Sequence, residues 1–172
     1  MFRRVRGFTL VEMVLTIVII AIAVAAITGT LAFAFRFQGE GIWRAKAMAL
    51  ADSYLEQILS RRFDETTPPG GNPPCTPATC TGAGAFDDGE ARALFDDVDD
   101  YDGIDDLPPV DESGAALAGF DGYRVQVAVA YADAGQITAF GLADATDLKV
   151  VTLTVTPPGK PAMQFRALKA NF

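Results

Sequence analysis

The sequence contains no histidine, so it lacks the side chain that serves most often as a general base and as a metal ligand. It has two cysteines, Cys75 and Cys80, which without histidine are too few for a tetrahedral zinc site within one chain. No glycine-rich phosphate loop follows an expected strand, and no serine has a recognisable base partner. The sequence therefore predicts neither an enzyme nor a resident cofactor.

Basic residues are also few, and their distribution is uneven. The chain has 14 Lys and Arg against 22 Asp and Glu, a net charge of −8. Arg3, Arg4 and Arg6 lie before the first apolar residues, so the rest of the chain is more acidic still. Binding to phosphate backbones requires clustered Lys and Arg, and we therefore expect no nucleic-acid partner.

The two cysteines stand close together in "PPCTPATC". In an oxidising compartment, a disulfide between Cys75 and Cys80 is favoured over two free thiols. Closing so short a loop adds at most about 2 kcal/mol, so the bond is expected to fix a local turn rather than the whole fold.

One long apolar run is present near the N-terminus. From Met13 to Phe35 there are 23 residues without a charge, about 34 Å of helix at ~1.5 Å per residue, enough to cross a hydrocarbon core of ~30 Å. The arginines before it favour a cytoplasmic N-terminus. We therefore expect one membrane span followed by one external domain.

Two ordinary interpretations of this segment remain open. A secretory signal is one, with "AVA" ending at Ala25 as the cleavage site, although the apolar run continues ten residues further. An uncut membrane anchor is the other, with Glu12 near the interface and favoured by the helix dipole. A glutamate at the start of the apolar run counts against the secretory signal.

Hydrophobic periodicity predicts a long helix from Phe8 to about Arg62, apolar in its first half and amphipathic in its second. In the second half, Trp43, Leu50, Tyr54 and Ile58 share one stripe. Residues 123–131, 148–155 and 162–169 alternate with period two and predict three antiparallel strands, the last two joined by the turn "TPPGKP". The apolar face of such a sheet needs a cover, so we predict an α+β fold with the helix packed across the sheet.

Proline and glycine interrupt regular structure after the helix, and acidic residues follow. Twelve of the 22 acids lie between residues 87 and 112, and a short helix is predicted over residues 89–98. Phe95, Val98, Tyr101, Ile104 and Leu107 recur every three residues, which indicates a structured turn with a buried apolar side. The acids themselves indicate either a solvated loop, with at most Arg92 or Arg124 nearby, or a calcium site, for which Asp97, Asp99 and Asp102 are the candidate ligands.

The segment "RGFTLVE" resembles the processing motif of type IV prepilins and of the pseudopilins of type II secretion. The resemblance implies that prepilin peptidase cleaves after Gly7 and that the new N-terminus, Phe8, is methylated. It also implies that Glu12 pairs with the terminal amine of a neighbouring pilin subunit when the helices bundle. An unpaired buried charge is expensive, so such a pair sets the register of assembly.

Further segments, among them "ALADSYLEQILSRRFDE" and "RALFDDVDDYDG", resemble minor pilins of the mannose-sensitive haemagglutinin (MSHA) pilus, of the MshD type. This likeness implies a structural subunit, held in the inner membrane with a periplasmic domain and later present in an extracellular bacterial pilus. A pseudopilin of type II secretion and a simple membrane-anchored periplasmic domain are the alternatives. The expected divisions are leader 1–7, transmembrane half-helix 8–35, amphipathic half-helix 36–63, loop region with the disulfide 64–121, and sheet 122–172.

Overall fold

The computed structural model describes residues 9–82, 86 and 89–171, and for residues 35–40 it describes the backbone alone. The chain divides into two compact units, Met1–Arg44 and Ala45–Phe172. Each unit is described separately below.

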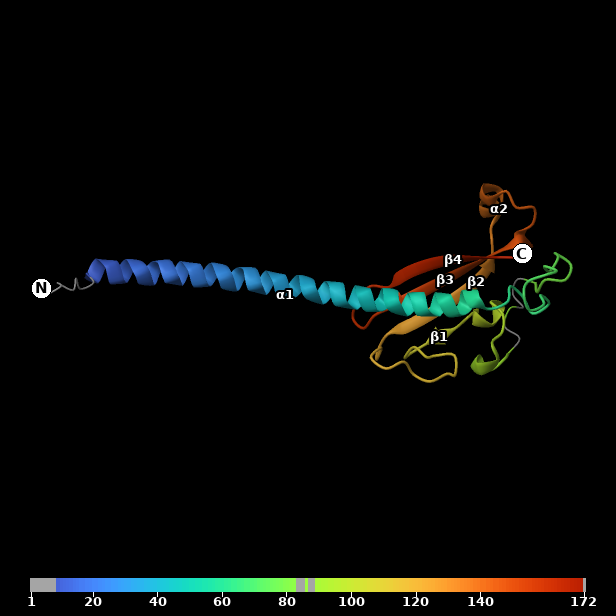
Figure 1. The fold of residues 1–172 in the computed structure, drawn as a ribbon, viewed down its shortest axis with the longest axis horizontal. Helices are drawn as coiled ribbons and strands as arrows, with labels where there is room; N and C mark the ends of the chain where they lie inside the picture. The colour runs from blue at the N-terminus through green and yellow to red at the C-terminus, as the bar shows by residue number, and fades with distance from the viewer. Residues whose placement is uncertain (1–8, 83–85, 87–88, 172) are drawn as a thin grey trace, which may run out of the picture. The chain divides into compact units, whose positions relative to one another are not determined.

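Helix α1 (Leu10–Ser60) contributes residues to both units (Figure 1). Within the second unit, it buries a stripe at helical spacing: Ala47, Leu50, Ala51, Tyr54 and Ile58. Trp43, which we predicted to lie on this stripe, is only half-buried. The last turn of α1 contains no basic residue. The Lys169 ammonium of another element supplies the favourable cation instead, donating to the carbonyls of Leu59 (2.8 Å) and Arg61 (2.7 Å).

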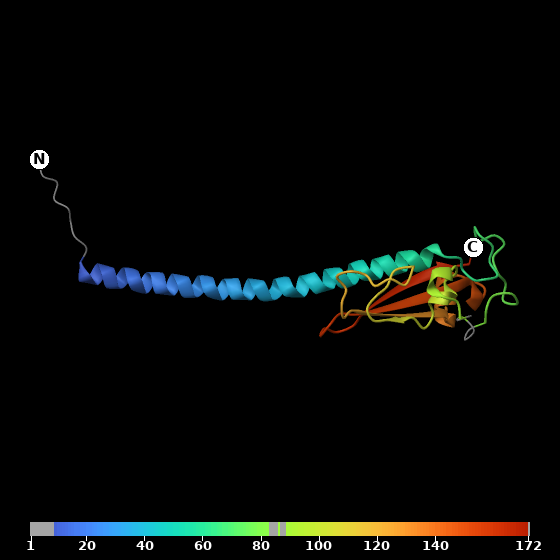
Figure 2. The same ribbon diagram turned by 90° about the horizontal axis from the view of Figure 1, so that it is seen from below.

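The second unit contains a four-stranded antiparallel sheet in the order β1-β2-β3-β4. Its strands are β1 (Asp105–Asp106), β2 (Arg124–Tyr131), β3 (Leu148–Thr156) and β4 (Met163–Ala170). The central pair is in register with Val127 opposite Leu153, and the next pair with Lys149 opposite Lys169. Figure 2 shows the C-terminal half of α1 lying along one face of this sheet.

The core forms where the α1 stripe meets the alternating side chains of β2 and β3. Val125, Val127 and Val129 come from β2, and Val151, Leu153 and Val155 from β3; all six are buried. Their spacing of two places them on one face of the sheet. The predicted α+β architecture, a long helix packed on a small antiparallel sheet, is confirmed.

The predicted strands agree with β2, β3 and β4 to within one residue at each end. The helix predicted over residues 89–98 is wrong, because only the single 3-10 turn η1 (Arg92–Leu94) forms there. A second 3-10 turn, η2 (Asp99–Tyr101), follows. Val98 and Tyr101 are buried in the core, and a continuous helix over residues 89–98 would not place both of them there. The backbone of Arg62 bonds to the acidic segment on both sides, through Asp96 O (3.1 Å) and Val98 N (3.1 Å).

Three further elements were not predicted: β1, the 3-10 turn η3 (Ala145–Asp147) and the short helix α2 (Ala134–Phe140). Helix α2 is closed at both ends by local chemistry. Asp133 and Gln136 form a reciprocal capping box, and Gly141 adopts the left-handed conformation that ends the helix (φ 67°).

Candidate functional site

The apolar first half of α1 is suited to a membrane rather than to a protein core. Residues Leu10–Ala34 have a mean hydropathy of 2.9, and none of the most apolar window is buried within the protein. The helix is apolar on all sides, so it offers no polar face to water. By length and composition, this is the one described helix able to cross a membrane.

Glu12 lies in the first turn of this apolar helix. Thr9 precedes the helix and its Oγ1 accepts the backbone N–H of Glu12 (3.3 Å), as an N-cap does. The Glu12 side chain is exposed, and within residues 9–82, 86 and 89–171 its carboxylate has no hydrogen-bond or ion-pair partner. Within the described residues, the apolar half of α1 therefore has one carboxylate without a partner, in its first turn. Gly7 and Phe8, the predicted processing residues, lie outside the described residues.

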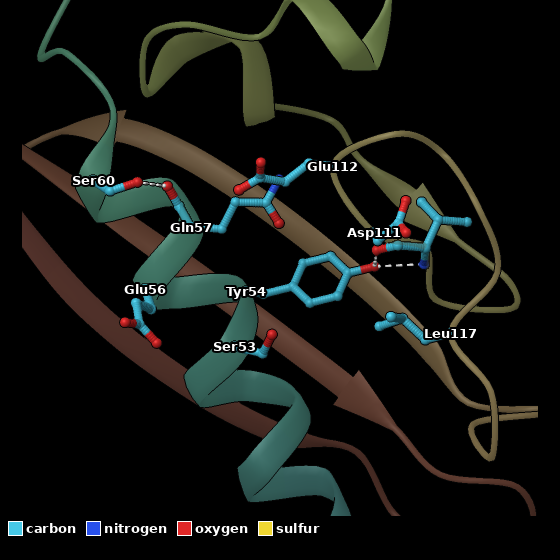
Figure 3. Close-up of a pocket in the computed structure, with 9 residues that line it drawn as sticks. Ser53, Tyr54, Glu56, Gln57, Ser60, Asp111, Glu112 and Leu117 are labelled. Atoms are coloured by element: carbon cyan, nitrogen blue, oxygen red, sulfur yellow. Dashed lines mark hydrogen bonds between the residues drawn. The ribbon is translucent and has the colours of Figure 1, made fainter.

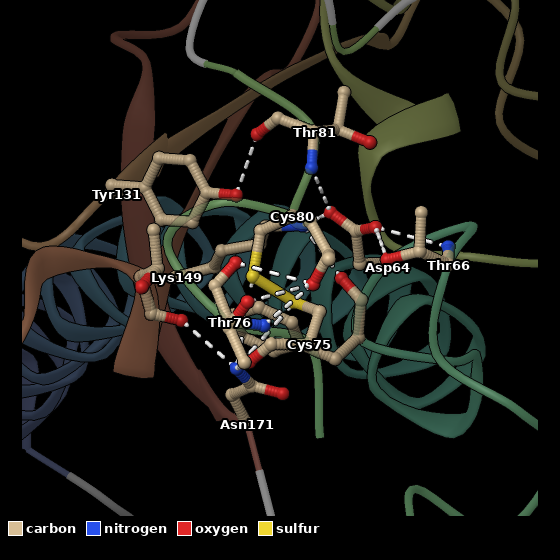
Figure 4. Close-up of a disulfide and its surroundings, with 12 residues drawn as sticks. Asp64, Thr66, Cys75, Thr76, Cys80, Thr81, Tyr131, Lys149 and Asn171 are labelled. Atoms are coloured by element: carbon tan, nitrogen blue, oxygen red, sulfur yellow. Dashed lines mark hydrogen bonds and ion pairs between the residues drawn. A yellow bond between two sulfur atoms is a disulfide. The ribbon is translucent and has the colours of Figure 1, made fainter. Parts of the chain in front are cut away.

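The predicted disulfide between Cys75 and Cys80 is present, with Cα atoms 5.1 Å apart. Its surroundings tie distant segments together (Figure 4). The Asn171 amide, just after β4, donates to the carbonyl of Cys75 (2.9 Å) and to that of Thr146 (3.2 Å). The small loop therefore anchors the end of the last strand, a role that its spacing alone did not indicate.

The acidic segment is folded onto the core rather than solvated throughout. Val98 and Tyr101 are fully buried, and Phe95 and Ile104 pack against the same core, so the predicted apolar side is confirmed for these four residues. It is wrong for Leu107, which is 63% exposed. Contrary to the solvated-loop interpretation, three acids here are also buried: Asp97, Asp99 and Asp100. The two nearby arginines pair with the end of the segment, Arg92 with Asp106 (2.8 Å) and Arg124 with Asp105.

The three candidate calcium ligands have different protein partners. Asp97 Oδ1 accepts the backbone N–H of Asp99 (2.7 Å), Asp99 Oδ2 accepts from Lys149 Nζ (2.6 Å), and Asp102 Oδ1 accepts the N–H of Val129 (2.8 Å). In the described part of the chain, the three do not form one group with ligand atoms within 4.8 Å of one another. Calcium binding stays a prediction.

Another acidic group does converge: ligand oxygens of Glu65, Asp96 and Asp97 lie within 4.8 Å of one another. The Arg62 guanidinium pairs with Glu65 (3.0 Å) and with Asp96, so a protein cation already contacts two of these three carboxylates.

We expect calcium to leave the thermal stability of the full chain unchanged, because protein donors or cations already contact each of these carboxylates. The test is thermal melting in detergent with millimolar calcium and then with excess chelator. A ligand bound only by the native state adds ~2.7 kcal/mol at 100 times its dissociation constant. A rise in the midpoint that the chelator reverses would establish the site.

Lys149 was not predicted as a site residue. It lies on the same buried face of β3 as Val151, Leu153 and Val155. A lysine at a core position of an alternating strand is the signal that was available. Lys149 is fully buried, and its ammonium donates to Phe63 O (2.7 Å), to Asp99 (2.6 Å) and to Asp64 (3.3 Å). The cluster of Asp64, Asp99 and Lys149 is referred to below as the buried ion cluster.

The carboxyls near Lys149 titrate differently. Burial raises the pKa of Asp99 to about 7, and the hydrogen bond and positive charge of Lys149 only partly offset this rise. Burial also acts to raise the pKa of Asp64, but hydrogen bonds from Thr66 and Thr81 outweigh it, so the pKa of Asp64 lies below its usual value. Asp64 therefore keeps its negative charge more readily than Asp99 does.

The raised pKa of Asp97 predicts how the stability of the protein depends on pH. Burial, and then the charge of Asp100, raises its pKa from 3.8 to about 6. Between about pH 4 and pH 6 the native state therefore holds a proton that the unfolded state releases, and the free energy of unfolding falls as the pH rises. Asp97→Asn keeps the acceptor oxygen without the charge. We expect it to exceed wild type in stability by about 2 kcal/mol at pH 7 and to match it near pH 4, measured by thermal melting.

The matched control for this titration is Asp111→Asn. Hydrogen bonds from Ser113 and Ala115 hold the pKa of Asp111 below its usual value, the opposite direction. Its asparagine variant should not be stabilised at pH 7. Equal pH profiles for wild type and Asp97→Asn would contradict the assignment to Asp97.

A groove of about 390 Å³ lies between α1 and residues 110–117 (Figure 3). Tyr54 crosses from α1 to this segment, donating to the Val110 carbonyl (2.9 Å) or to Asp106 (2.8 Å) and accepting the Val110 N–H (2.9 Å). Burial raises the pKa of the Tyr54 phenol well above its usual value, so it remains a hydroxyl. The lining consists of hydroxyl, amide, carboxylate and aliphatic groups and contains no histidine, cysteine or lysine, so no activated nucleophile is assembled there.

Residues 2–28 match the family model of the prokaryotic N-terminal methylation motif, a range that includes Gly7, Phe8 and Glu12. No curated protein and no solved structure matched the chain significantly. The motif supports a type IV pilin-like or pseudopilin-like structural subunit rather than an enzyme. It implies processing by prepilin peptidase and anchoring in a bacterial membrane through the apolar helix.

Proposed function

We propose that the chain is a minor subunit of an MSHA-like type IV pilus, joined to other pilin subunits through the first half of α1. The observation that supports this most directly is the position of Glu12. Among the described residues it is an unpaired carboxylate in the first turn of an apolar span, inside the range that matches the methylation motif. Such an anion needs a cation from another molecule when the helix leaves water.

In this proposal, cleavage between Gly7 and Phe8 supplies that cation. Hydrolysis frees an amine on Phe8, and N-methylation retains its positive charge. The amine of one subunit and Glu12 of its neighbour then neutralise each other within the bundle of apolar helices, where an unpaired charge costs several kcal/mol. The pair fixes the axial register between subunits.

Before assembly, the subunit is held in the inner membrane by residues 8–35, and residues 36–172 lie in the periplasm. The disulfide supports an oxidising compartment for the second unit, because disulfides persist there and are rare in the cytosol. After assembly the subunit is part of an extracellular pilus. A type II secretion pseudopilin would share the processing and the membrane stage but would act in protein export, so deletion phenotypes separate the two functions.

The experiment that tests processing is mass spectrometry of the mature N-terminus in cells with and without prepilin peptidase. We expect a chain that begins at methylated Phe8 when the peptidase is present. Gly7→Leu is expected to abolish maturation, because a branched side chain before the scissile bond obstructs an extended backbone in the protease cleft. An intact Met1 in cells with the peptidase, or a start at Ala26, would refute the proposal.

A further inference from the structure

The three side chains of the buried ion cluster are in contact with one another through Lys149 and are shielded from solvent. Lys149 Nζ lies 2.6 Å from Asp99 Oδ2 and 3.3 Å from Asp64 Oδ2, and all three side chains have exposed fractions of 3% or less. We propose that Lys149 and Asp99 condense to form an intramolecular amide, an isopeptide bond, with Asp64 as the carboxylate that transfers protons. No enzyme, cofactor or oxidant is needed for this step.

Proximity favours the condensation. Lys149 lies on the central strand β3, and Asp99 begins the turn η2, whose neighbours are buried in the same core. The reacting groups are therefore held at contact distance by two fixed elements. Orientation of this kind replaces a bimolecular encounter and raises the effective concentration of the amine by several orders of magnitude.

Aromatic rings and the core enclose the reacting groups. The Lys149 ammonium lies 4.3 Å from the ring centroid of Phe63 and 5.3 Å from those of Phe86 and Tyr131. These rings keep bulk water from the pair, and burial raises the pKa of Asp99, which favours its neutral carboxylic acid form. A neutral amine is the nucleophile, and a neutral carboxylic acid is the form that it attacks.

The partners of the two carboxylates indicate their different roles. Asp64 accepts hydrogen bonds from Thr66 N (3.0 Å), Thr66 Oγ1 (2.7 Å) and Thr81 N (2.7 Å), so it remains satisfied without Lys149. Asp99 Oδ1 is buried and has no hydrogen-bond partner in the described part of the chain. The ion pair thus leaves one oxygen of Asp99 unsatisfied, whereas amide formation removes the charge on Asp99.

The step balances within the chain. Lys149 passes one ammonium proton to Asp99 Oδ2, and the freed lone pair of Nζ attacks Cγ of Asp99. Asp64 takes a second proton from Nζ and returns it to the departing oxygen of Asp99. One N–C bond forms, one C–O bond breaks, and one water leaves; one positive and one negative charge disappear, and nothing is oxidised or reduced.

The product would join positions 50 residues apart, linking the turn after the disulfide loop to the central strand of the sheet. The segment between them includes β2 and α2. This covalent link would prevent the sheet from being extended between the two positions, which suits a subunit that bears tension in a filament.

Tryptic peptide mapping of the full chain, purified in detergent and denatured, tests the proposal. Trypsin cuts after Arg92, Arg124 and Lys149 but passes Lys160, which precedes a proline. A modified Lys149 is not cut. The expected product is therefore a branched peptide of residues 93–124 joined to residues 125–166, one water lighter than the sum of the two. The peptides 93–124 and 125–149 should be lost.

Two variants identify the reacting groups. Lys149→Arg keeps a cation but forms no amide, and trypsin should then release 93–124 and 125–149 as separate peptides. Asp64→Asn keeps the shape of the proton carrier without its basicity, and the branched peptide should be lost while the Cys75–Cys80 disulfide still forms. The disulfide is read from its own peptide, 63–92, as the control for folding.

Free 93–124 and 125–149 from the wild-type chain would overturn the proposal, whatever the variants do. A branched peptide in Asp64→Asn at the wild-type yield would overturn the role of Asp64. A branch at a lysine other than Lys149 or at an acid other than Asp99, located by fragmentation of the branched peptide, would contradict the assignment of the bond.

Discussion

Glu12→Leu is expected to lower incorporation of the subunit into filaments at least tenfold, while membrane insertion and cleavage after Gly7 continue. The substitution removes the only charge between residues 9 and 34. Insertion should therefore improve, since an acidic residue is costly within an apolar span. Assembly should fail, because the neighbouring amine loses its counter-charge inside the helix bundle. A penalty of 1.4 kcal/mol already corresponds to a factor of ten, and a buried unpaired charge costs more.

The measurement is the amount of the variant in sheared pili relative to the amount in the membrane, each determined by immunoblotting. Thr16→Val is the matched control, because it also makes the first turns of α1 more apolar without removing a charge. The Thr16 hydroxyl only donates to the Met13 carbonyl of its own helix (2.8 Å). Normal incorporation of Glu12→Leu would refute the pairing role.

Lys149→Met should lower the free energy of unfolding of the second unit by about 3–5 kcal/mol. Methionine fills a similar volume, so the loss arises mainly from charge rather than from a cavity. Asp64 and Asp99 lose the nitrogen that they share, whether it is the ammonium of an ion pair or the nitrogen of the proposed amide, and both remain as buried carboxylates. The Phe63 carbonyl loses its donor. Removing one member of a buried ion pair is destabilising by this amount.

Urea denaturation of the detergent-purified chain, followed by brief proteolysis, measures this change. Lys169→Met is the matched control on the neighbouring strand: its ammonium contacts two helix carbonyls at 2.7 and 2.8 Å and is only partly buried. A loss of about 1 kcal/mol is expected for that variant. The double variant Lys149→Met/Asp99→Leu should recover part of the stability, because it removes an uncompensated charge. An unchanged stability in Lys149→Met alone would show that the buried ion cluster is not stabilising.

The regular elements were predictable because their periodicity is strong. Alternation from Val125 to Val129 and from Val151 to Val155 defines two buried rows, and a stripe from Ala47 to Ile58 supplies their cover. The two-residue strand β1 was not predictable, because Asp105 and Asp106 have low strand propensity and form the ladder only as neighbours of β2. The pairing of β1 with β2, distant in the sequence, therefore determines this strand.

Helix α2 did leave a sequence signal, the spacing of Asp133, Gln136 and Gly141, which is that of a capped two-turn helix. The error over residues 89–98 has the opposite cause. Arg92 and Leu94 favour a helix locally, but Val98 and Tyr101 are held in the core by contacts distant in the sequence. Local propensity is a weak guide where burial decides.

The candidate site divides in the same way. Gly7, Phe8 and Glu12 were assigned from a short motif, and a carboxylate in an apolar run is unusual enough to be noticed in the sequence. The buried ion cluster was not foreseen. Asp64, Asp99 and Lys149 are separated by 35 and 50 residues, and among 22 acids nothing in the sequence marks the two that share a buried lysine.

The bond from Lys169 to the end of α1 has a consequence for the order of folding. It joins residues 110 positions apart, so the end of the helix is completed only after β4 has paired with β3. Pairings of such long range form slowly. Until then the stripe of Ala47, Leu50, Tyr54 and Ile58 has no sheet to cover it, on a chain already inserted in the bilayer. We therefore expect the newly made chain to present an amphipathic helix, whose apolar side a lipid interface can cover until the sheet replaces it.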